Sequence, residues 1–278
     1  MSAINIQDYK VSIESGLGDV FYVPEFVSES EEEYLLRKIY ESPQVTWKTL
    51  RNRRLQTYGG IISGASRVLI PTPIPDFLTR YPDILTRLEG TGVFQGSKHG
   101  RPNHVLLNEY NSGQGIMPHE DGPSYFPAVG TISLGSHTVV DYYRYRPLAE
   151  TDDADAGAAT GQRGRAIDPV PVLSVLLEPR SLVITTKELY TEFLHGIEER
   201  TQDKFCPHEG SSQLEATDSE GTRIANYRML HNDDIKKCTA EGGVLKRQTR
   251  ISLTCRDYEN VGRAGRALNT IMVPGGSR

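Results

Sequence analysis

The hydrophobic pattern of the chain changes character near residue 103. Downstream, short runs rich in Val, Ile, Thr and Tyr are separated by Gly, Pro, Asn and Asp. Branched and aromatic side chains suit a pleated, half-buried surface, so these runs predict strands of an antiparallel sandwich or barrel. We predict a mainly β fold with some α, in which residues 103–258 form a jelly-roll-like double sheet. The strands are expected within HVLLNEY, VGTISLGS, HTVVDYYRY, VPVLSVLLE, RSLVITT, YRMLH and QTRISLTCR.

The first 102 residues mix helical and extended patterns, and we expect them to form an extension packed on that core. Ser28 and Glu31 have the spacing of a capping box, and apolar residues then recur at helical spacing until Pro43. Pro75 begins one or two further short helices, which Pro82 interrupts. Short strands are predicted at residues 21–23 and 55–58.

Two polar segments, residues 147–171 and 200–225, interrupt the predicted strands. They carry few large apolar side chains and therefore cannot bury enough surface to offset the entropy of ordering. We expect both to be flexible insertions. The chain then divides into an extension (1–102) and a core (103–278) that form one structural unit.

Composition narrows the setting in which the protein works. The chain has no apolar run of about 18 residues, so we expect no membrane span. It begins without a basic segment leading into an apolar one, and its three cysteines lack framework spacing. Both features favour an intracellular protein, in the cytoplasm or nucleus. We expect it to be a monomer.

The net charge of −5 argues against a surface that binds polyanions throughout. Basic residues are nevertheless clustered, and such a patch can hold phosphates even on an acidic protein. The alternative is a pair of ordinary solvated faces. One cluster is Arg51, Arg53 and Arg54, and the other is Lys246, Arg247, Arg250 and Arg256 with Arg263 and Arg266.

His119-Glu120-Asp121 provides the strongest chemical signal. On extended backbone, residues two apart project to the same face, so the imidazole and the carboxylate can bind one metal ion. A further imidazole would complete the two-histidine, one-carboxylate set used by non-heme Fe(II) oxygenases, which leaves the remaining metal positions open. His195 leads as the third ligand because Gly196 could provide a turn that aims it inward. The other candidates are His137, His208 and His231.

Two arginines of one predicted strand suggest an anion site. Arg250 and Arg256 are an even number of residues apart and share a face, but their stems lie on the order of 20 Å apart. One can therefore bind an anionic cosubstrate while the other works nearer the metal or the substrate. Asn108 and Tyr110 share a face of their own strand and could bond to the same ligand.

These segments together resemble the AlkB-type Fe(II)/2-oxoglutarate-dependent dioxygenases, and within that family the group of the sixth eukaryotic AlkB homologue. The resemblance rests on NHVLLNEYNSGQGIMPHEDGPSYFPAVGTISLGSHTV, on LHGI and on the R-x5-R of RISLTCR. FYVPEFVSESEEEYLLRKIYESP and RRLQTYGG add to it. It covers most of the chain except the two polar segments.

The resemblance implies a double-stranded β-helix (jelly roll) with an N-terminal helical and strand extension. It also implies roles for individual residues. Fe(II) is expected at His119, Asp121 and His195. The 2-oxoglutarate cosubstrate is expected at Asn108, Tyr110, Arg250 and Arg256, with Arg250 on its distal carboxylate and Arg256 nearer the active centre. A substrate lid is expected at Arg54 and Tyr58.

The implied activity is oxidative demethylation or dealkylation of a nucleic acid, DNA or RNA, with O2 as oxidant and release of formaldehyde from an N-methyl group. One alternative is the same chemistry on a protein or a small molecule. Another is a non-catalytic binding jelly roll that keeps a metal for stability. A complete metal triad beside a complete arginine anchor argues against this last alternative.

Overall fold

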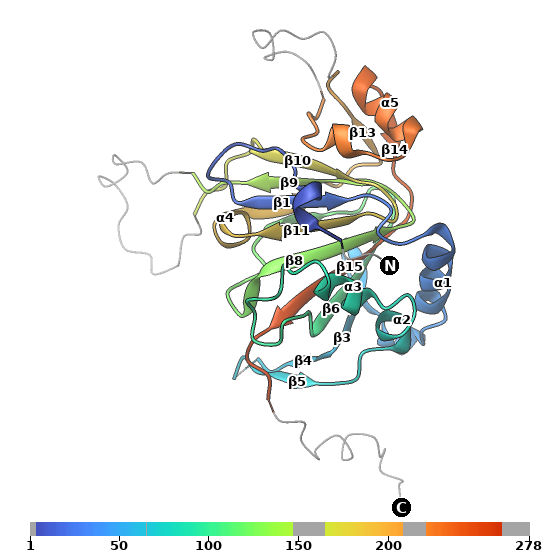
Figure 1. Cartoon of the computed structure of the whole chain (residues 1–278). Coiled ribbons are helices and arrows are strands. Elements are labelled where there is room, and N and C mark those ends of the chain that lie inside the picture. The colour runs from blue at the N-terminus through green and yellow to red at the C-terminus, as the bar shows by residue number, and fades with distance from the viewer. Residues whose placement is uncertain (1–3, 65, 147–164, 208–220, 263–278) are drawn as a thin grey trace, which may run out of the picture.

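Two β-sheets face each other and form a double-stranded β-helix, which confirms the predicted fold class (Figure 1). The computed structural model describes residues 4–64, 66–146, 165–207 and 221–262. The larger sheet has seven antiparallel strands in the order β1 (Asp19–Val23), β11 (Leu182–Thr186), β8 (Tyr125–Leu134), β15 (Arg250–Tyr258), β6 (His104–Tyr110), β3 (Arg53–Tyr58) and β2 (Lys48–Leu50). The smaller sheet has the order β10 (Leu173–Leu177), β9 (Thr138–Tyr143), β12 (Leu194–Ile197) and β7 (Ile116–His119).

Helices cover the outer face of the larger sheet. They are α1 (Glu29–Tyr40), α2 (Asp76–Thr79) and α3 (Ile84–Glu89), with α1 and α2 on the right in Figure 1. Ser28 and Glu31 form the predicted capping box at the start of α1, and α2 and α3 are separate helices with Pro82 between them. Leu35 and Leu88 pack in one apolar cluster with Leu107 of the sheet, so burial of these helix faces fixes the outer layer.

The predicted extension shares its main sheet with the predicted core. Residues before 103 contribute β1, β2 and β3 to the larger sheet, and β1 and β3 cover the predicted strands at residues 21–23 and 55–58. These strands pair directly with strands of the jelly roll, β1 with β11 and β3 with β6. The two parts of the chain are therefore joined by backbone hydrogen bonds rather than by side-chain packing alone.

One of the predicted strands is wrong. YRMLH contains a 3-10 helix, η3 (Tyr227–Met229), instead of a strand. The side-chain amide of Asn226 just before it bonds to both backbone groups of Leu176, accepting at 3.0 Å and donating at 2.8 Å. A buried side chain thus makes the hydrogen bonds that a neighbouring strand would have made with this residue of β10.

Part of the predicted second insertion is ordered. Within residues 200–225, β13 (Gln202–Lys204) pairs with β14 (Val244–Lys246) beside α5 (Asp233–Glu241). Residues 208–220 and most of the first insertion, residues 147–164, lie outside the described residues. Flexibility of those parts therefore stays a prediction.

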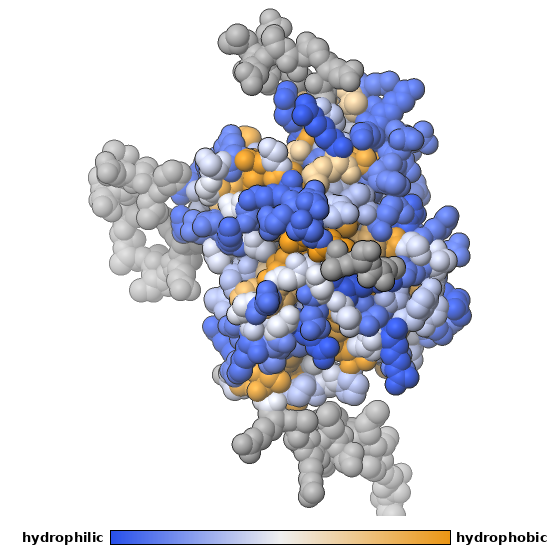
Figure 2. Space-filling view, viewed as in Figure 1, coloured by the Kyte–Doolittle hydropathy of each residue, from blue (hydrophilic) through white to orange (hydrophobic). Residues whose placement is uncertain are grey.

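The remaining elements are short. A hairpin of β4 (Gly60–Ile62) and β5 (Leu69–Pro71) leaves Ile61, Ile62 and Ile70 exposed, and Figure 2 shows apolar surface over it on an otherwise largely hydrophilic face. Two further 3-10 helices are η1 (Ile6–Tyr9) and η2 (Gln44–Thr46), and α4 (Glu188–Thr191) precedes β12. No helix among the described residues is long and apolar enough to cross a membrane.

Asp203 of β13 is a buried charge held by several partners. Arg247 donates two hydrogen bonds to it, each 2.7 Å long, and His137 Nε2 lies 3.1 Å from its Oδ2. Burial opposes ionisation, but Arg247 and His137 outweigh it and hold the pKa of Asp203 well below its usual range. Since the pKa is lower in the folded state, the ionised carboxylate stabilises the fold above the unfolded pKa of about 4. This stability is lost as the pH falls further, toward the folded pKa.

We expect Asp203→Asn to lower the free energy of unfolding at neutral pH by about 3–5 kcal/mol, because Arg247 is left buried without its counter-charge. The variant should also lose less stability than the wild type as the pH falls from about 5 to about 2. Urea denaturation at several pH values measures both effects. Glu41→Gln, at the exposed end of α1, is the control and should change little. Equal stability of Asp203→Asn and the wild type would refute this role.

Candidate metal and cosubstrate site

A cavity of about 300 Å³ lies between the two sheets. The larger sheet contributes the inner faces of β6, β15, β8 and β11, and the smaller sheet contributes β7, β9, β10 and β12. The structure brings seven of the nine predicted site residues to its lining. They are Asn108, Tyr110, His119, Asp121, His195, Arg250 and Arg256.

The predicted metal ligands converge at one end of this cavity. His119 ends β7 and lies opposite His195 of β12 in the strand register, with 4.4 Å between the ring centroids. Asp121 follows two residues after His119, and one ligand atom from each of the three side chains lies within 4.8 Å of the others. No other such group of three occurs among the described residues.

The other histidines considered as third ligand are placed elsewhere or lie outside the described residues. His137 contacts Asp203, and the backbone N–H of His231 donates to Glu178. His208 lies outside the described residues. Of the candidates that the structure places, only His195 reaches His119 and Asp121.

Strand pairing aims His195 inward, and not the turn expected at Gly196, which lies within β12. The short helix α4 ends at Thr191, and β12, which carries His195, begins three residues later at Leu194. Gly196 instead permits a close approach of β12 to β7, since a Cβ there would lie only 3.0 Å from the backbone nitrogen of Pro118. The tight contact between these two strands places both imidazoles side by side.

The contacts around His119, His195 and Asp121 leave their ligand atoms available to a divalent cation. His119 Nδ1 donates to the backbone carbonyl of Met117 at 2.9 Å, which leaves the Nε2 lone pair for a metal. Burial lowers the pKa of His195 to about 4, so this imidazole is neutral at physiological pH. Arg256 donates to Oδ1 of Asp121 at 2.6 Å, while the buried Oδ2 has no hydrogen-bond partner. Two imidazoles and an unsatisfied carboxylate oxygen fit Fe(II).

Arg250 lies deep in the cavity and has no counter-ion among the described residues. It is 3% exposed and donates to Ser133 Oγ at 2.9 Å. Burial lowers its pKa to about 10, which still leaves it charged at neutral pH. Asn108 and Tyr110 of β6 lie on the same wall, opposite Ser252 and Arg250 in the register. A buried cation beside an amide and a phenol needs an anionic ligand to offset its desolvation.

Arg256 lies at the metal end of the same strand face, as the even spacing of the two arginines predicts. It forms an ion pair with Asp121, and its guanidinium lies 4.4 Å from the centre of the Tyr125 ring. The geometry is compatible with the expected division of roles: Arg250 has no carboxylate partner among the described residues, and Arg256 pairs with Asp121, a predicted metal ligand.

Arg54 and Tyr58, the two predicted lid residues, do not line the cavity. Arg54 pairs with Glu109 and lies 4.1 Å over the Trp47 ring. Tyr58 packs edge-on against Phe77 of α2. Even-numbered residues of β3 face the helix layer, so both side chains point away from the cavity.

Arg53 reaches the cavity instead, and the sequence analysis missed it. It lies next to Arg54 on the opposite face of β3, lines the cavity, and donates from Nε to Asn108 Oδ1 at 3.1 Å. This contact fixes the orientation of the Asn108 amide. Only the pairing of β3 with β6 shows which of the two neighbouring arginines faces the cavity. The run of arginines in the sequence does not distinguish them.

We expect Arg53→Gln to raise the KM for 2-oxoglutarate about tenfold with little change in stability, since it loses a bond that orients Asn108. Arg54→Gln is the matched neighbour. It should lower the free energy of unfolding by about 1–3 kcal/mol, because Glu109 loses its charged partner, and leave the KM unchanged. Steady-state kinetics and urea denaturation of both variants separate the two roles. The same change in KM from both variants would contradict this assignment.

Comparisons with known proteins agree on one family. The model of the 2OG-Fe(II) oxygenase superfamily matches residues 19–256. A Danio rerio protein named "Probable RNA/DNA demethylase ALKBH6" is 36% identical over 245 residues, which cover 88% of each protein. A Xenopus tropicalis protein, "tRNA (carboxymethyluridine(34)-5-O)-methyltransferase alkbh8", is 28% identical over 84% of this chain and 31% of its own length. The solved structure of OsALKBH1 aligns with a TM-score of 0.45 and 14% identity, over 89% of this chain and 99% of that chain.

Proposed function

Because this chain belongs to the 2OG-Fe(II) oxygenase superfamily, whose members use Fe(II), 2-oxoglutarate and O2, we propose that it oxidatively removes alkyl groups from nucleic acid. The observation that carries the chemistry is the convergence of His119, Asp121 and His195 with the unpaired Arg250 in one cavity. The nucleic-acid substrate is supported by the similarity to the Danio rerio protein, whose name describes an RNA/DNA demethylase.

We assign the residues as follows. His119, Asp121 and His195 hold Fe(II), and Asn108, Tyr110 and Arg250 hold 2-oxoglutarate, with Arg250 on the distal carboxylate. When bound, the iron supplies activation of O2, coupled to decarboxylation of 2-oxoglutarate to succinate and to hydroxylation of a substrate methyl group. If that methyl group is attached to nitrogen, the hydroxylated product breaks down and releases formaldehyde.

The protein orients the reacting groups. Ser133 holds the Arg250 guanidinium, and Arg53 holds the Asn108 amide, so both cosubstrate contacts are fixed before the ligand enters. Arg256 engages one oxygen of Asp121 and leaves the other for the metal. These contacts lower the cost of ordering the site when it is occupied.

The protein also keeps the site dry and holds the loop that follows Asp121. Buried apolar side chains, among them Leu177 and Val183 of the two sheets and Leu189 of α4, line the cavity and limit water around the reacting groups. Tyr190 donates its hydroxyl proton to the carbonyl of Gly122 at 3.2 Å, which fixes the loop that follows Asp121.

We further propose that the protein acts as a monomer inside the cell, in the cytoplasm or the nucleus.

The test of the substrate class is formaldehyde release. The protein, with Fe(II), ascorbate and 2-oxoglutarate, is supplied with N-methylated oligonucleotides of DNA or RNA, or with N-methylated peptides. We expect formaldehyde from at least one oligonucleotide, and none when 2-oxoglutarate is omitted. Formaldehyde from peptides alone would overturn the nucleic-acid assignment and leave the oxygenase chemistry standing.

A further inference from the structure

We propose that Arg144, Arg146 and Arg165 form a basic rim at the mouth of the cavity and bind the phosphates of the nucleic-acid strand that presents its nucleotide to the metal. This inference rests on the proposed function. It assigns the contact with the strand to residues on either side of residues 147–164.

The rim lies beside the metal ligands. In β9, Tyr142 lines the cavity and pairs with His195, so Arg144 follows only about 7 Å further along the same chain. The Tyr145 hydroxyl donates to Oε1 of Glu120 at 2.8 Å. Glu120 lies between the metal ligands His119 and Asp121 in the chain and itself lines the cavity. The Tyr145 side chain therefore links the rim to the segment that carries His119 and Asp121.

Two backbone hydrogen bonds keep the rim in a defined shape. Arg146 donates its N–H to the carbonyl of Ala166 at 2.8 Å, and Asp168 donates to the carbonyl of Arg144 at 2.9 Å. Residues 144–146 and 165–168 thus form a short antiparallel ladder, with Tyr145 opposite Ile167. This ladder brings Arg165 beside Tyr145 and close to Arg146, although about twenty residues separate them in sequence.

Aromatic rings position two of the three guanidinium groups. Arg165 lies 4.4 Å from the centre of the Tyr145 ring, and Arg144 lies 5.3 Å from the centre of the Phe193 ring. Stacking uses the face of a guanidinium and leaves its N–H edges available. Those edges match the oxygens of a phosphate, to which arginine binds with two parallel hydrogen bonds.

Three arginines against the two carboxylates Asp168 and Glu120 leave the rim with a net positive charge. All three arginines are exposed, and none forms an ion pair within the part of the chain that the structure describes. The carboxylate of Asp168 accepts a hydrogen bond from the Val170 N–H, and that of Glu120 accepts one from the Tyr145 hydroxyl, so neither is paired with an arginine of the rim. Three unpaired cations on a chain of net charge −5 favour a polyanion at this place.

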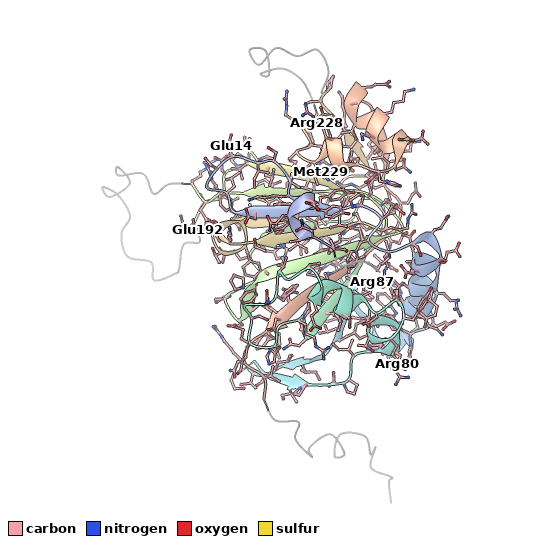
Figure 3. All side chains as sticks on the ribbon, in the orientation of Figure 1. Glu14, Arg80, Arg87, Glu192, Arg228 and Met229 are labelled. Atoms are coloured by element: carbon pink, nitrogen blue, oxygen red, sulfur yellow. The ribbon has the colours of Figure 1, made fainter. Side chains whose placement is uncertain are left out.

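The test compares two triple variants that each remove three positive charges. One carries Arg144→Gln, Arg146→Gln and Arg165→Gln. The control carries Arg37→Gln, Arg80→Gln and Arg228→Gln, which are exposed and lie elsewhere. Figure 3 shows Arg80 beside α2 and Arg228 near α5, both away from Glu192, the residue before Phe193.

Fluorescence anisotropy measures the binding of a labelled single-stranded oligonucleotide over a range of salt concentrations, with Mn(II) and 2-oxoglutarate present. For the rim variant we expect affinity on the order of tenfold lower at low salt, and a slope of log K against log salt that is shallower by about 2. The control variant should keep the wild-type slope. Thermal stabilisation by Mn(II) and 2-oxoglutarate shows that the rim variant is folded.

The outcomes separate the two proposals. If the wild type binds and demethylates oligonucleotides but the rim and control variants share its slope, the rim is refuted and the proposed function stands. If the wild type binds a polyglutamate peptide through these arginines and no oligonucleotide, both the rim assignment and the nucleic-acid substrate are wrong. A slope reduced in the rim variant alone supports the inference.

Discussion

Asp121→Ala is expected to reduce O2-dependent succinate formation from 2-oxoglutarate by at least about 100-fold. Changes in the residues that merely orient metal ligands already cost about 10- to 100-fold, and here a ligand itself is lost. The substitution also removes the partner of the buried Arg256. We therefore expect a lower content of bound metal together with the loss of turnover.

Succinate yield and metal content per chain are measured on the same preparations. Asp76→Asn, on the exposed surface of α2, is the matched control and should behave as the wild type. It does not line the cavity. Wild-type succinate yield from Asp121→Ala would exclude this residue as an iron ligand.

Arg250→Met is expected to raise the KM for 2-oxoglutarate at least about 100-fold, because a charge-assisted pair worth up to about 3 kcal/mol is lost. Its effect on stability should have the opposite sign. Arg250 is a buried cation that no carboxylate of the described residues neutralises, so its replacement by an apolar side chain removes a desolvation cost. Without 2-oxoglutarate, the variant should be as stable as the wild type or more stable.

Kinetics and urea denaturation, with and without 2-oxoglutarate, test both parts. Arg250→Lys should recover part of the affinity for 2-oxoglutarate, since lysine keeps the positive charge but lacks the two parallel N–H donors of the guanidinium. Ser133→Ala should raise the KM only several-fold, because the charge remains and one orienting bond is lost. An unchanged KM in Arg250→Met would show that the anion binds elsewhere.

Most candidate site residues can be predicted from the sequence, because side chains alternate along a strand and the spacing shows which residues share a face. Alternation places His119 and Asp121 on one face, and the even spacing of Arg250 and Arg256 places both in the cavity. Local spacing does not decide the third candidate ligand, since His195 reaches His119 through a pairing between strands far apart in sequence. That pairing places His195 beside His119 and Asp121, whereas the turn expected at Gly196 is absent.

The residues that the sequence analysis missed depend on register between strands. Arg53 and Arg54 are neighbours of the same type, and only the pairing of β3 with β6 decides which of them faces the cavity. Ser133 meets Arg250 across two strands separated by more than a hundred residues. In YRMLH, a buried Asn226 side chain overrides the local strand pattern. Each case is decided by tertiary contacts that local pattern does not encode.

Anaerobic calorimetry of 2-oxoglutarate binding tests most directly whether one cavity holds metal and cosubstrate together. With Mn(II) in place of iron, we expect the wild type to bind 2-oxoglutarate at least about tenfold more tightly than without metal, since the metal and Arg250 engage the same molecule. Asp121→Ala should lose the dependence on metal, and Arg250→Met should lose most of the affinity. Binding that is equally tight without metal, or unaffected by Arg250→Met, would contradict a shared site.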